Sequence, residues 1–313
     1  KTFITIAVIL LSFGAFSQEK YALIVGVSDY GNESDWSNLD TELDVLLVKK
    51  AIETQGFKTS NIITLQDADA TKEGILEALT NLSQKAQRGD VVYFHFSGHG
   101  QHMWEPDDTP KDEPDGWDES LVCYGAKTQY SIDYKGESHL RDDELKLIID
   151  ELQQKLGESG NVFFTIDACY SGSIERGGLK VRGAYDALKP KGYSPPPYNV
   201  RNFETGLETT KAGKDKAPVI VFSASPEFKM AKQCQISDIE GYENTQMGTL
   251  SYALQKELGS GEYIRDYTSL FNRVKSSMAK VNPKEVPVAS GNLDIELFAG
   301  TSTKYPKYYK VTD

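Results

Sequence analysis

The sequence has little positive charge for its size, which limits the partners that it can bind. Its 313 residues include 34 Lys and Arg against 46 Asp and Glu, a net charge of −12. Binding to a nucleic acid or an anionic membrane needs clustered Lys and Arg, so neither is expected as the main partner. A cationic substrate or a metal ion suits this charge balance better.

Long apolar runs are missing except for a short one at the beginning of the chain. Residues 3–16 are apolar, small or hydroxylic, follow the basic Lys1, and lead into the small-x-small triplet 15–17. This run is shorter than the roughly 20 residues that a membrane-spanning helix needs, and its layout is typical of a secretory signal peptide. A buried strand or a membrane anchor is the alternative. We therefore expect residues 1–17 to direct export, to the periplasm or out of the cell, and no stable membrane span.

Cysteine is scarce, with only three residues: Cys123, Cys169 and Cys234. In an exported protein, three cysteines leave at least one without a disulfide partner in the chain. An odd cysteine is either a reactive thiol or the site of an intermolecular bridge. The count alone does not distinguish these two roles.

Histidine is also scarce, and the four His residues do not form the helical HExxH zinc motif. His95 follows residues typical of a strand, and no Glu comes directly after it. His95, His99 and His102 are close enough in sequence to leave a zinc site as a minor alternative. We expect His95 to pack against a sheet, and His102 and His139 to lie on the surface.

What the sequence does contain is an alternation of short strands and amphipathic helices. The expected strands are residues 21–27, 62–65, 91–96, 162–166 and 219–223. The expected helices are residues 41–55, 71–86, 142–156, 249–258 and 267–281. The strands are rich in β-branched and aromatic residues, and the helices repeat apolar residues every three to four positions. This alternation predicts an α/β fold with a mainly parallel central sheet flanked by helices.

Two longer segments interrupt the alternation, and their length is typical of functional loops. Residues 105–119 are rich in Asp and Glu but do not have the spacing of a calcium-binding EF-hand loop. Residues 173–217 are rich in Gly, Pro, Lys and Arg, a composition typical of a flexible, protease-accessible segment.

The residues that can carry chemistry come directly after two predicted strands. Strand 91–96 leads into the sequence SGHG, and strand 162–166 leads into DACYSG. In a parallel α/β sheet both loops leave at the carboxyl edge, where such folds bind ligands. If the two strands are neighbours, His99 and Cys169 meet at that edge.

A thiol next to an imidazole predicts nucleophilic catalysis. With an ordinary pKa near ~8.5, Cys169 would be only a few per cent thiolate at neutral pH, so His99 is the expected activating base. The backbone amides of Gly100 and Cys169 are candidates for binding a substrate oxyanion, at roughly 3 kcal/mol per donor. Taken singly, a buried Cys or a strand-end His is usually structural. The prediction depends on their occurring together.

Both motifs resemble the paired signatures of the caspase-like peptidases, and the metacaspase branch in particular. The signatures are HFSGHG at 95–100 and DACYSG at 167–172, with further similarity in ALIVGVSDY (22–30), LDTELDV (39–45), SA (223–224), GTLSYAL (248–254) and VPVASG (286–291). The resemblance implies a caspase-haemoglobinase-like three-layer sandwich over residues 18–300, with a tail at 301–313. It also implies a cysteine endopeptidase with a Cys169–His99 dyad, acting on proteins or peptides, with no cofactor in the chemistry. One departure is Tyr170, where many metacaspases have His.

The resemblance further implies a substrate pocket that selects a basic residue before the cleaved bond. It assigns this pocket, called S1, to Asp44, Ser97 and Asp167, whose carboxylates suit a guanidinium or an ammonium group. A solvated helix residue is the alternative for Asp44, and a turn cap is the alternative for Asp167. The family's Gly-Cys pair before the first helix is replaced by Asp40 and Thr41, which leaves the far wall of the pocket open to question.

Many members of the family are stimulated by calcium, and the resemblance places its ligands at Asp118, Asp142 and Asp143. Glu175 lies near the fourth position and Arg176 at it, and a cation there weighs against a site. Calcium takes six to eight oxygen ligands, so these carboxylates would need backbone and water as well. The alternative is a solvated acidic loop.

The basic loop 173–217 suggests that such an enzyme also cuts itself. Two other functions stay open: a peptidase with Asp or Asn specificity, and an inactive caspase-like binding module. The module would be expected to lack Cys169 or His99, and both are present. A monomer is favoured, and the natural substrate is not indicated by the sequence.

Overall fold

The computed structural model describes residues 18–105, 116–170, 180–184, 186–194, 215–225 and 231–299. The predicted signal peptide (1–17) and the predicted tail (301–313) lie outside these ranges. No helix in the described part of the chain is long and apolar enough to cross a membrane.

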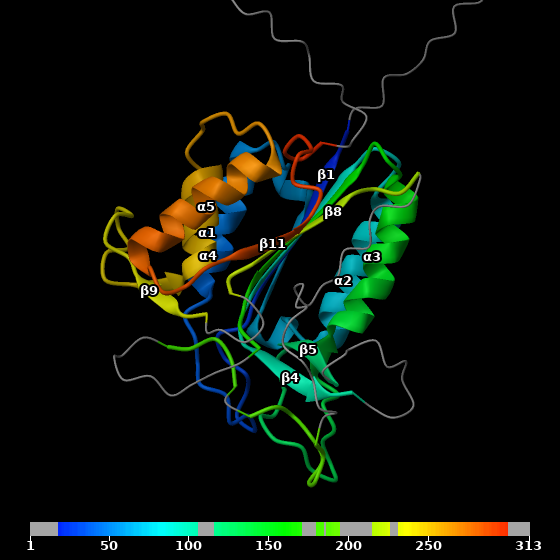
Figure 1. The fold of residues 1–313 in the computed structure, drawn as a ribbon, viewed down its shortest axis with the longest axis vertical. Coiled ribbons are helices and arrows are strands. Elements are labelled where there is room, and N and C mark those ends of the chain that lie inside the picture. The colour runs from blue at the N-terminus through cyan, green and yellow to red at the C-terminus, as the bar shows by residue number, and fades with distance from the viewer. Residues whose placement is uncertain are drawn as a thin grey trace, which may run out of the picture.

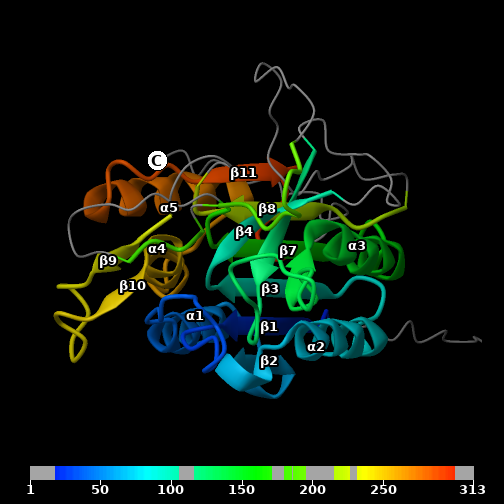
Figure 2. The ribbon, with the colours of Figure 1, turned by 90° about the horizontal axis from the view of Figure 1, so that it is seen from below.

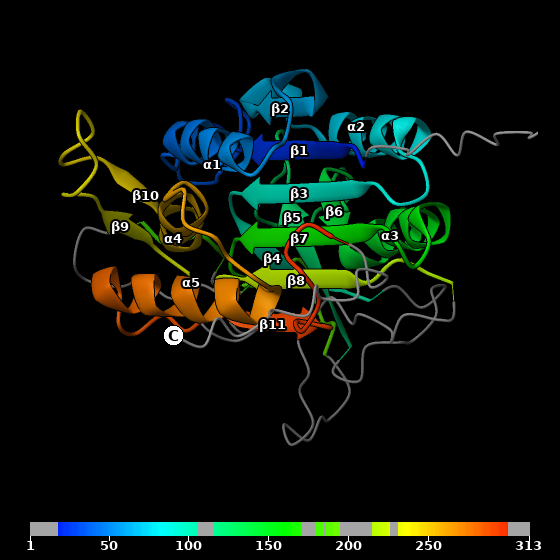
Figure 3. The ribbon, with the colours of Figure 1, turned by 90° about the horizontal axis from the view of Figure 1, so that it is seen from above.

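A six-stranded sheet forms the middle layer of the molecule (Figure 1). In the order β11-β8-β7-β3-β1-β2, its strands are β11 (Val288–Gly291), β8 (Val219–Ser223), β7 (Asn161–Asp167), β3 (Val91–Ser97), β1 (Lys20–Gly26) and β2 (Ile62–Gln66). Only β11 runs antiparallel to its neighbour in this sheet, as the opposite direction of its arrow shows in Figure 3. The five predicted strands and their mainly parallel arrangement are confirmed, and β11 is an addition to them.

Helices cover both faces of this sheet (Figure 1). One face carries α1 (Glu42–Thr54), α4 (Thr249–Leu258) and α5 (Tyr267–Val281), and the other carries α2 (Lys72–Lys85) and α3 (Asp142–Leu156). Because side chains alternate along a strand, β3 sends Phe94 and Phe96 into the core below α2 and α3, and Tyr93 into the core below α1, α4 and α5. All seven β3 residues are buried. The structure therefore confirms the α/β sandwich.

Two small sheets lie outside the main layers. The first is β4 (Gly100–Trp104), β5 (Trp117–Val122) and β6 (His139–Arg141), and the second is β9 (Gln233–Gln235) and β10 (Gln246–Gly248). Figure 2 shows β4 near the ends of β3 and β7, and β9 and β10 beside α4. Single turns of 3-10 helix occur at Thr59–Asn61 and Asp67–Asp69. Three of these strands, β6, β9 and β10, have three residues each, too few for an alternation of apolar and polar residues to predict them.

The predicted surface positions of His102 and His139 are wrong, because the first small sheet buries both. His102 is 8% exposed and His139 is fully buried. The ring of His139 donates to Gln101 Oε1 and accepts from the Tyr134 hydroxyl, each at 2.8 Å. By contrast, His95 is buried in the main sheet as predicted, with Thr165 Oγ1 2.7 Å from its Nδ1.

Candidate active site

The loops that follow β3 and β7 run side by side at the carboxyl edge of the sheet. The two strands are neighbours in parallel register, with Ser97 opposite Asp167. The amide of Gly98 donates to the carbonyl of Asp167 at 3.3 Å. A Cβ atom on Gly100 would lie 2.9 Å from the carbonyl oxygen of Cys169, so glycine permits this close approach. The fold therefore brings the loops of His99 and Cys169 together, as their positions after adjacent strands predicted.

His99 is held by aromatic rings and a backbone carbonyl. Its imidazole stacks on Trp36 with 4.7 Å between ring centroids, and the Tyr30 ring lies at 5.2 Å. Nε2 donates to the carbonyl of Ser37 at 2.8 Å. Since a carbonyl only accepts, this bond fixes the proton on Nε2 and leaves the lone pair on Nδ1. That Nδ1 is buried and has no hydrogen-bond partner among the described residues.

The surroundings of His99 keep its imidazole neutral at neutral pH. Burial lowers its pKa to about 4, partly opposed by the hydrogen bond to Ser37 and reinforced by the positive charges of Arg182 and Lys180. A neutral imidazole is the form that can accept a proton. His99 is therefore suited to act as a base through Nδ1.

The three residues predicted for the S1 pocket converge on one guanidinium group, that of Arg182. Its Nη2 lies 2.7 Å from Asp44 Oδ2, and its Nη1 lies 2.6 Å from Ser97 Oγ. Nη1 also donates to the main-chain carbonyl of Asp167 at 3.0 Å, and it lies 3.8 Å from the side-chain Oδ1 of the same residue. All four side chains are completely buried. Asp44, Ser97 and Asp167 thus form a buried acidic cluster around a basic residue of the same chain.

Charge balance explains how this buried group is tolerated. Burial alone would lower the pKa of Arg182, but the negative charges of Asp167 and Asp44 raise it, so the guanidinium stays protonated. Burial raises the pKa of Asp44 to about 6, while the positive charge of Arg182 opposes that rise. An unpaired charge in this pocket would be costly, because the side chains are withdrawn from water.

Residues before and within α4 complete the pocket, and sequence reasoning missed them. The Gly248 amide donates to Asp44 Oδ1 at 3.0 Å, and Asp167 Oδ2 accepts from the amide and hydroxyl of Ser251 at 2.7 and 2.6 Å. A Cβ on Gly248 would lie 2.1 Å from Asp167 Oδ2 and 2.7 Å from Arg182 Cζ, so any larger residue would fill the pocket. Gly248 and Ser251 therefore add contacts to the predicted pocket, and the effect of the replacement at Asp40 and Thr41 stays open. The only signal for them was the GTLSYAL similarity.

The carbonyl group of Arg182 occupies the position predicted for a substrate oxyanion. Its oxygen accepts from the Cys169 amide at 2.9 Å and from the Gly100 amide at 3.1 Å. The preceding residues are extended: Val181 forms an antiparallel bridge with Lys232, and the Arg182 amide donates to the Ala231 carbonyl at 3.0 Å. Residues 180–182 therefore lie in the site as a bound peptide would.

The residues after Arg182 are attached to β4. Gly183 forms a parallel bridge with Gly100, and Leu188 forms another with Met103. Leu188 is fully buried in a cluster with Met103 and Tyr134. The chain thus passes through the site and is held on both sides of the 182–183 bond.

The predicted calcium ligands do not form a ready site in the described residues. The Asp118 carboxylate is buried and ion-paired with Arg141, while Asp142 and Asp143 begin α3. No group of three His, Cys, Asp or Glu side chains in the described ranges could hold a metal ion, the zinc alternative included. Glu175 and Arg176 lie outside those ranges.

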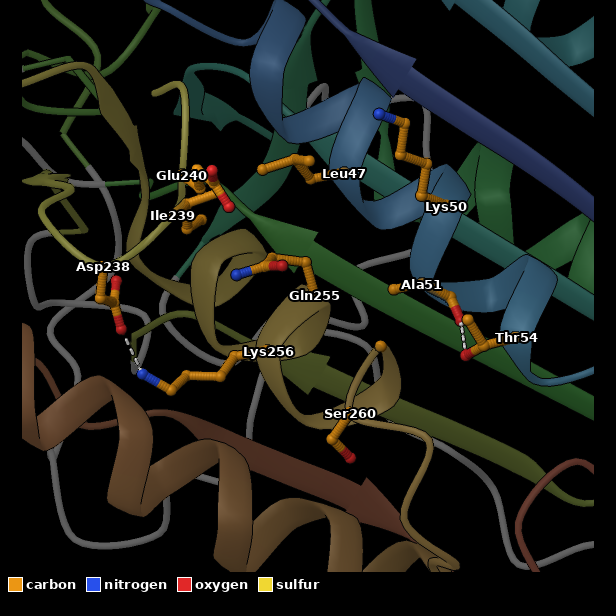
Figure 4. A pocket seen from close by; sticks show the side chains of 11 residues that line it. Leu47, Lys50, Ala51, Thr54, Asp238, Ile239, Glu240, Gln255, Lys256 and Ser260 are labelled. Atoms are coloured by element: carbon orange, nitrogen blue, oxygen red, sulfur yellow. Dashed lines mark hydrogen bonds and ion pairs between the residues drawn. The ribbon is translucent and has the colours of Figure 1, made fainter. Parts of the chain in front are cut away.

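A hollow outside the candidate site lies between α1 and α4 (Figure 4). Residues from α1, including Leu47 and Ala51, border it on one side, and Gln255 and the ion pair of Asp238 with Lys256 border it on the other. It contains none of the residues that sequence analysis singled out. The candidate site is therefore the edge where Cys169 and His99 lie.

Comparisons with known proteins agree on one domain type. The caspase domain matches residues 19–298. Metacaspase-1 of Lodderomyces elongisporus is 31% identical over 170 residues, which make up 52% of this chain and 35% of that protein. Metacaspase-1A of Neurospora crassa is 30% identical over 167 residues, 50% of this chain and 33% of that protein. The chain thus spans about a third of the length of these curated relatives.

A solved structure supports the fold. The crystal structure of protein GSU0716 from Geobacter sulfurreducens matches with a TM-score of 0.57 and 19% identity, over 87% of this chain and 93% of that one.

None of the three cysteines of the present chain, all of them described, forms a disulfide.

Proposed function

Since the chain belongs to the caspase-domain family, with metacaspases among its relatives, we propose that it is a cysteine endopeptidase that cuts after Arg and Lys. One observation carries the proposal. The guanidinium of Arg182 fills the acidic pocket while its carbonyl oxygen accepts from the amides of Cys169 and Gly100. Side chain and scissile carbonyl are thus held together as a substrate requires. The first substrate is then the protein's own 182–183 bond.

The chemistry follows from this arrangement. His99 Nδ1 takes the thiol proton of Cys169, and the thiolate attacks the carbonyl carbon of Arg182. The resulting oxyanion accepts from the Gly100 and Cys169 amides, each contributing roughly 3 kcal/mol. The bond to the Gly183 nitrogen breaks as that nitrogen receives the proton from His99. Water, deprotonated by His99, then hydrolyses the thioester and leaves Arg182 with a free carboxylate.

The same pocket favours basic residues over acidic or neutral ones. A guanidinium or ammonium supplies the positive charge that Asp44 and Asp167 need in a buried setting. An Asp side chain would add a third negative charge, and Asn would leave both carboxylates uncompensated. A non-catalytic binding module is the weaker candidate, because Cys169 and His99 are both present at the edge that holds Arg182.

Self-cleavage provides the direct test of this function. We expect purified wild-type protein to yield a fragment whose N-terminal residue is Gly183, as determined by N-terminal sequencing. Arg182→Lys should still be cut there, because an ammonium also fits the pocket, whereas Arg182→Ala should stay intact at this bond. Lys191→Ala, which changes an exposed basic residue of the same loop, is the matched control and should be cut like wild type. Cleavage of Arg182→Ala between the same two residues would contradict the proposal.

A peptide panel tests specificity independently of the chain's own cleavage. Peptides ending in Arg or Lys before a fluorogenic leaving group should be hydrolysed, and those ending in Asp or Asn should not. Hydrolysis of the Asp peptide alone would overturn the pocket assignment. Running the panel with calcium and with a chelator tests the predicted stimulation by calcium. Export and a monomeric state likewise stay predictions from the sequence.

The pH dependence of self-cleavage follows from the surroundings of His99. We expect self-cleavage to remain fast down to about pH 5, because the imidazole, with a pKa of about 4, is still neutral there. Once Arg182 and Lys180 have left, the loss of their positive charges raises that pKa. The acid limb of kcat/KM for peptide hydrolysis, which reports the enzyme before a peptide binds, should then lie at higher pH than that of self-cleavage.

This can be measured on uncut protein whose Cys169 is reversibly capped as a mixed disulfide and then released in buffers of pH 4 to 8. Coincident acid limbs near the ordinary imidazole pKa of about 6.5 would contradict the prediction.

A further inference from the structure

Residues 180–182, the bound segment, contain a second basic residue, Lys180. This residue has its own acidic partner. Its Nζ lies 3.1 Å from Asp40 Oδ2, and the two side chains are 38% and 48% exposed. Lys180 stands two residues before Arg182, and alternate residues of an extended chain point to the same side. Asp40 stands four residues before Asp44, just ahead of α1. One helix start therefore provides a carboxylate for each basic side chain.

Asp40 is positioned by the same strand that pairs with the bound segment. The Gln233 amide donates to the Lys180 carbonyl at 3.1 Å. In the orientation that satisfies its neighbours, the Gln233 side chain donates to Asp40 Oδ2 at 3.2 Å and accepts from the Asp40 amide at 2.9 Å. The backbone of residue 180 and the carboxylate facing its side chain thus share one support. Asp40 would therefore face the corresponding side chain of any peptide whose backbone accepts from Gln233 in the same way.

We propose that Asp40 is a second specificity-determining residue, which selects Lys or Arg two residues before the cleaved bond, the P3 position. This rests on the proposed cleavage after basic residues and extends it to a second position. Because the pair is partly exposed, its effect is moderate: we expect about a twofold to fivefold gain in kcat/KM for Lys over Ala at P3. A peptide with Glu at P3 should be cleaved more slowly than one with Ala, because the Glu carboxylate would face the negative charge of Asp40.

The test uses self-cleaved protein and three peptides that all end in Arg and carry Lys, Ala or Glu at P3. In wild type, kcat/KM should be highest for the Lys peptide, lower for the Ala peptide and lowest for the Glu peptide. These differences should shrink as the salt concentration rises from about 0.05 to about 0.5 M, because salt screens the interaction between exposed charges. Asp40→Asn should remove most of the preference, and Asp40→Lys should favour Glu over Lys. Glu42→Gln changes the same charge at an exposed position of α1 and should keep the wild-type order.

The chain itself offers a second measurement that needs no peptide. Lys180→Glu should slow self-cleavage after Arg182, and adding Asp40→Lys should restore it, because the two charges are then exchanged. Equal kcat/KM for the three peptides in wild type, or an equal loss of preference in Glu42→Gln, would overturn the role of Asp40. Either result would leave the proposed function intact, whereas failure to cleave any peptide ending in Arg would contradict that function instead.

Discussion

Replacing Cys169 by Ala is expected to abolish hydrolysis of Arg peptides and to leave the protein's own chain uncut. In the proposed mechanism this sulfur forms the thioester, and no other residue can replace it. Loss of an attacking nucleophile costs at least about 10³-fold in kcat. Ala fits the space without adding atoms, so the fold should persist. Mass spectrometry of the purified protein and hydrolysis of an Arg peptide measure both effects.

Cys123→Ala provides the matched control for this experiment. Cys123 is also fully buried, but it packs in the core cluster on the α2 and α3 side of the sheet. Its replacement should lower the thermal stability modestly and preserve both peptide hydrolysis and self-cleavage. Thermal unfolding of Cys169→Ala should remain cooperative, which would show that its fold persists. A Cys169→Ala protein that yields the same fragments as wild type would show that another protease cuts the loop.

Replacing Asp44 by Asn is expected to lower kcat/KM for Arg peptides by at least about 100-fold. The guanidinium in the pocket would lose the carboxylate that lies 2.7 Å from it. Breaking one partner of a buried ion pair costs about 3–5 kcal/mol, because the remaining charge stays buried without its counterion. Self-cleavage after Arg182 should be slowed for the same reason.

The clearest readout is a pair of peptides that end in Arg or in citrulline, its uncharged analogue. Wild type should strongly prefer Arg, and Asp44→Asn should narrow that preference because the pocket has lost negative charge. Glu53→Gln is the control, since Glu53 lies on the same helix and its carboxylate contacts Lys49 and Thr59. An unchanged ratio of Arg to citrulline hydrolysis in Asp44→Asn would exclude Asp44 as the specificity residue.

The sequence was informative where local pattern and structure coincide. The central strands are buried on both faces and rich in β-branched and aromatic residues, so their positions could be predicted closely. The loops of His99 and Cys169 could be placed at one edge because parallel neighbouring strands end there. The similarity of LDTELDV to the family's first helix added Asp44, which lies on α1 and shows no local sign of facing the residues at the ends of β3 and β7.

Other features depended on contacts that sequence does not encode locally. Arg182 is one of many Lys and Arg residues between 173 and 217, and only its position in three dimensions distinguishes it from the rest. Gly248 at the end of β10 and Ser251 in α4 contact this cluster from far along the chain. His139 was misplaced on the surface because β6 has only three residues, too few to show a buried alternation. Pairing between distant short segments decided each of these cases.

The position of β7 beside β8 determines what a break at residue 182 would do to the whole protein. These two strands flank the loop that is cut, and they are joined through five paired positions from Val162 opposite Val219 to Ile166 opposite Ser223. The nicked molecule would consequently migrate as one particle in gel filtration and separate into two polypeptides only in denaturant. Self-cleavage would therefore not change the size of the protein measured under native conditions.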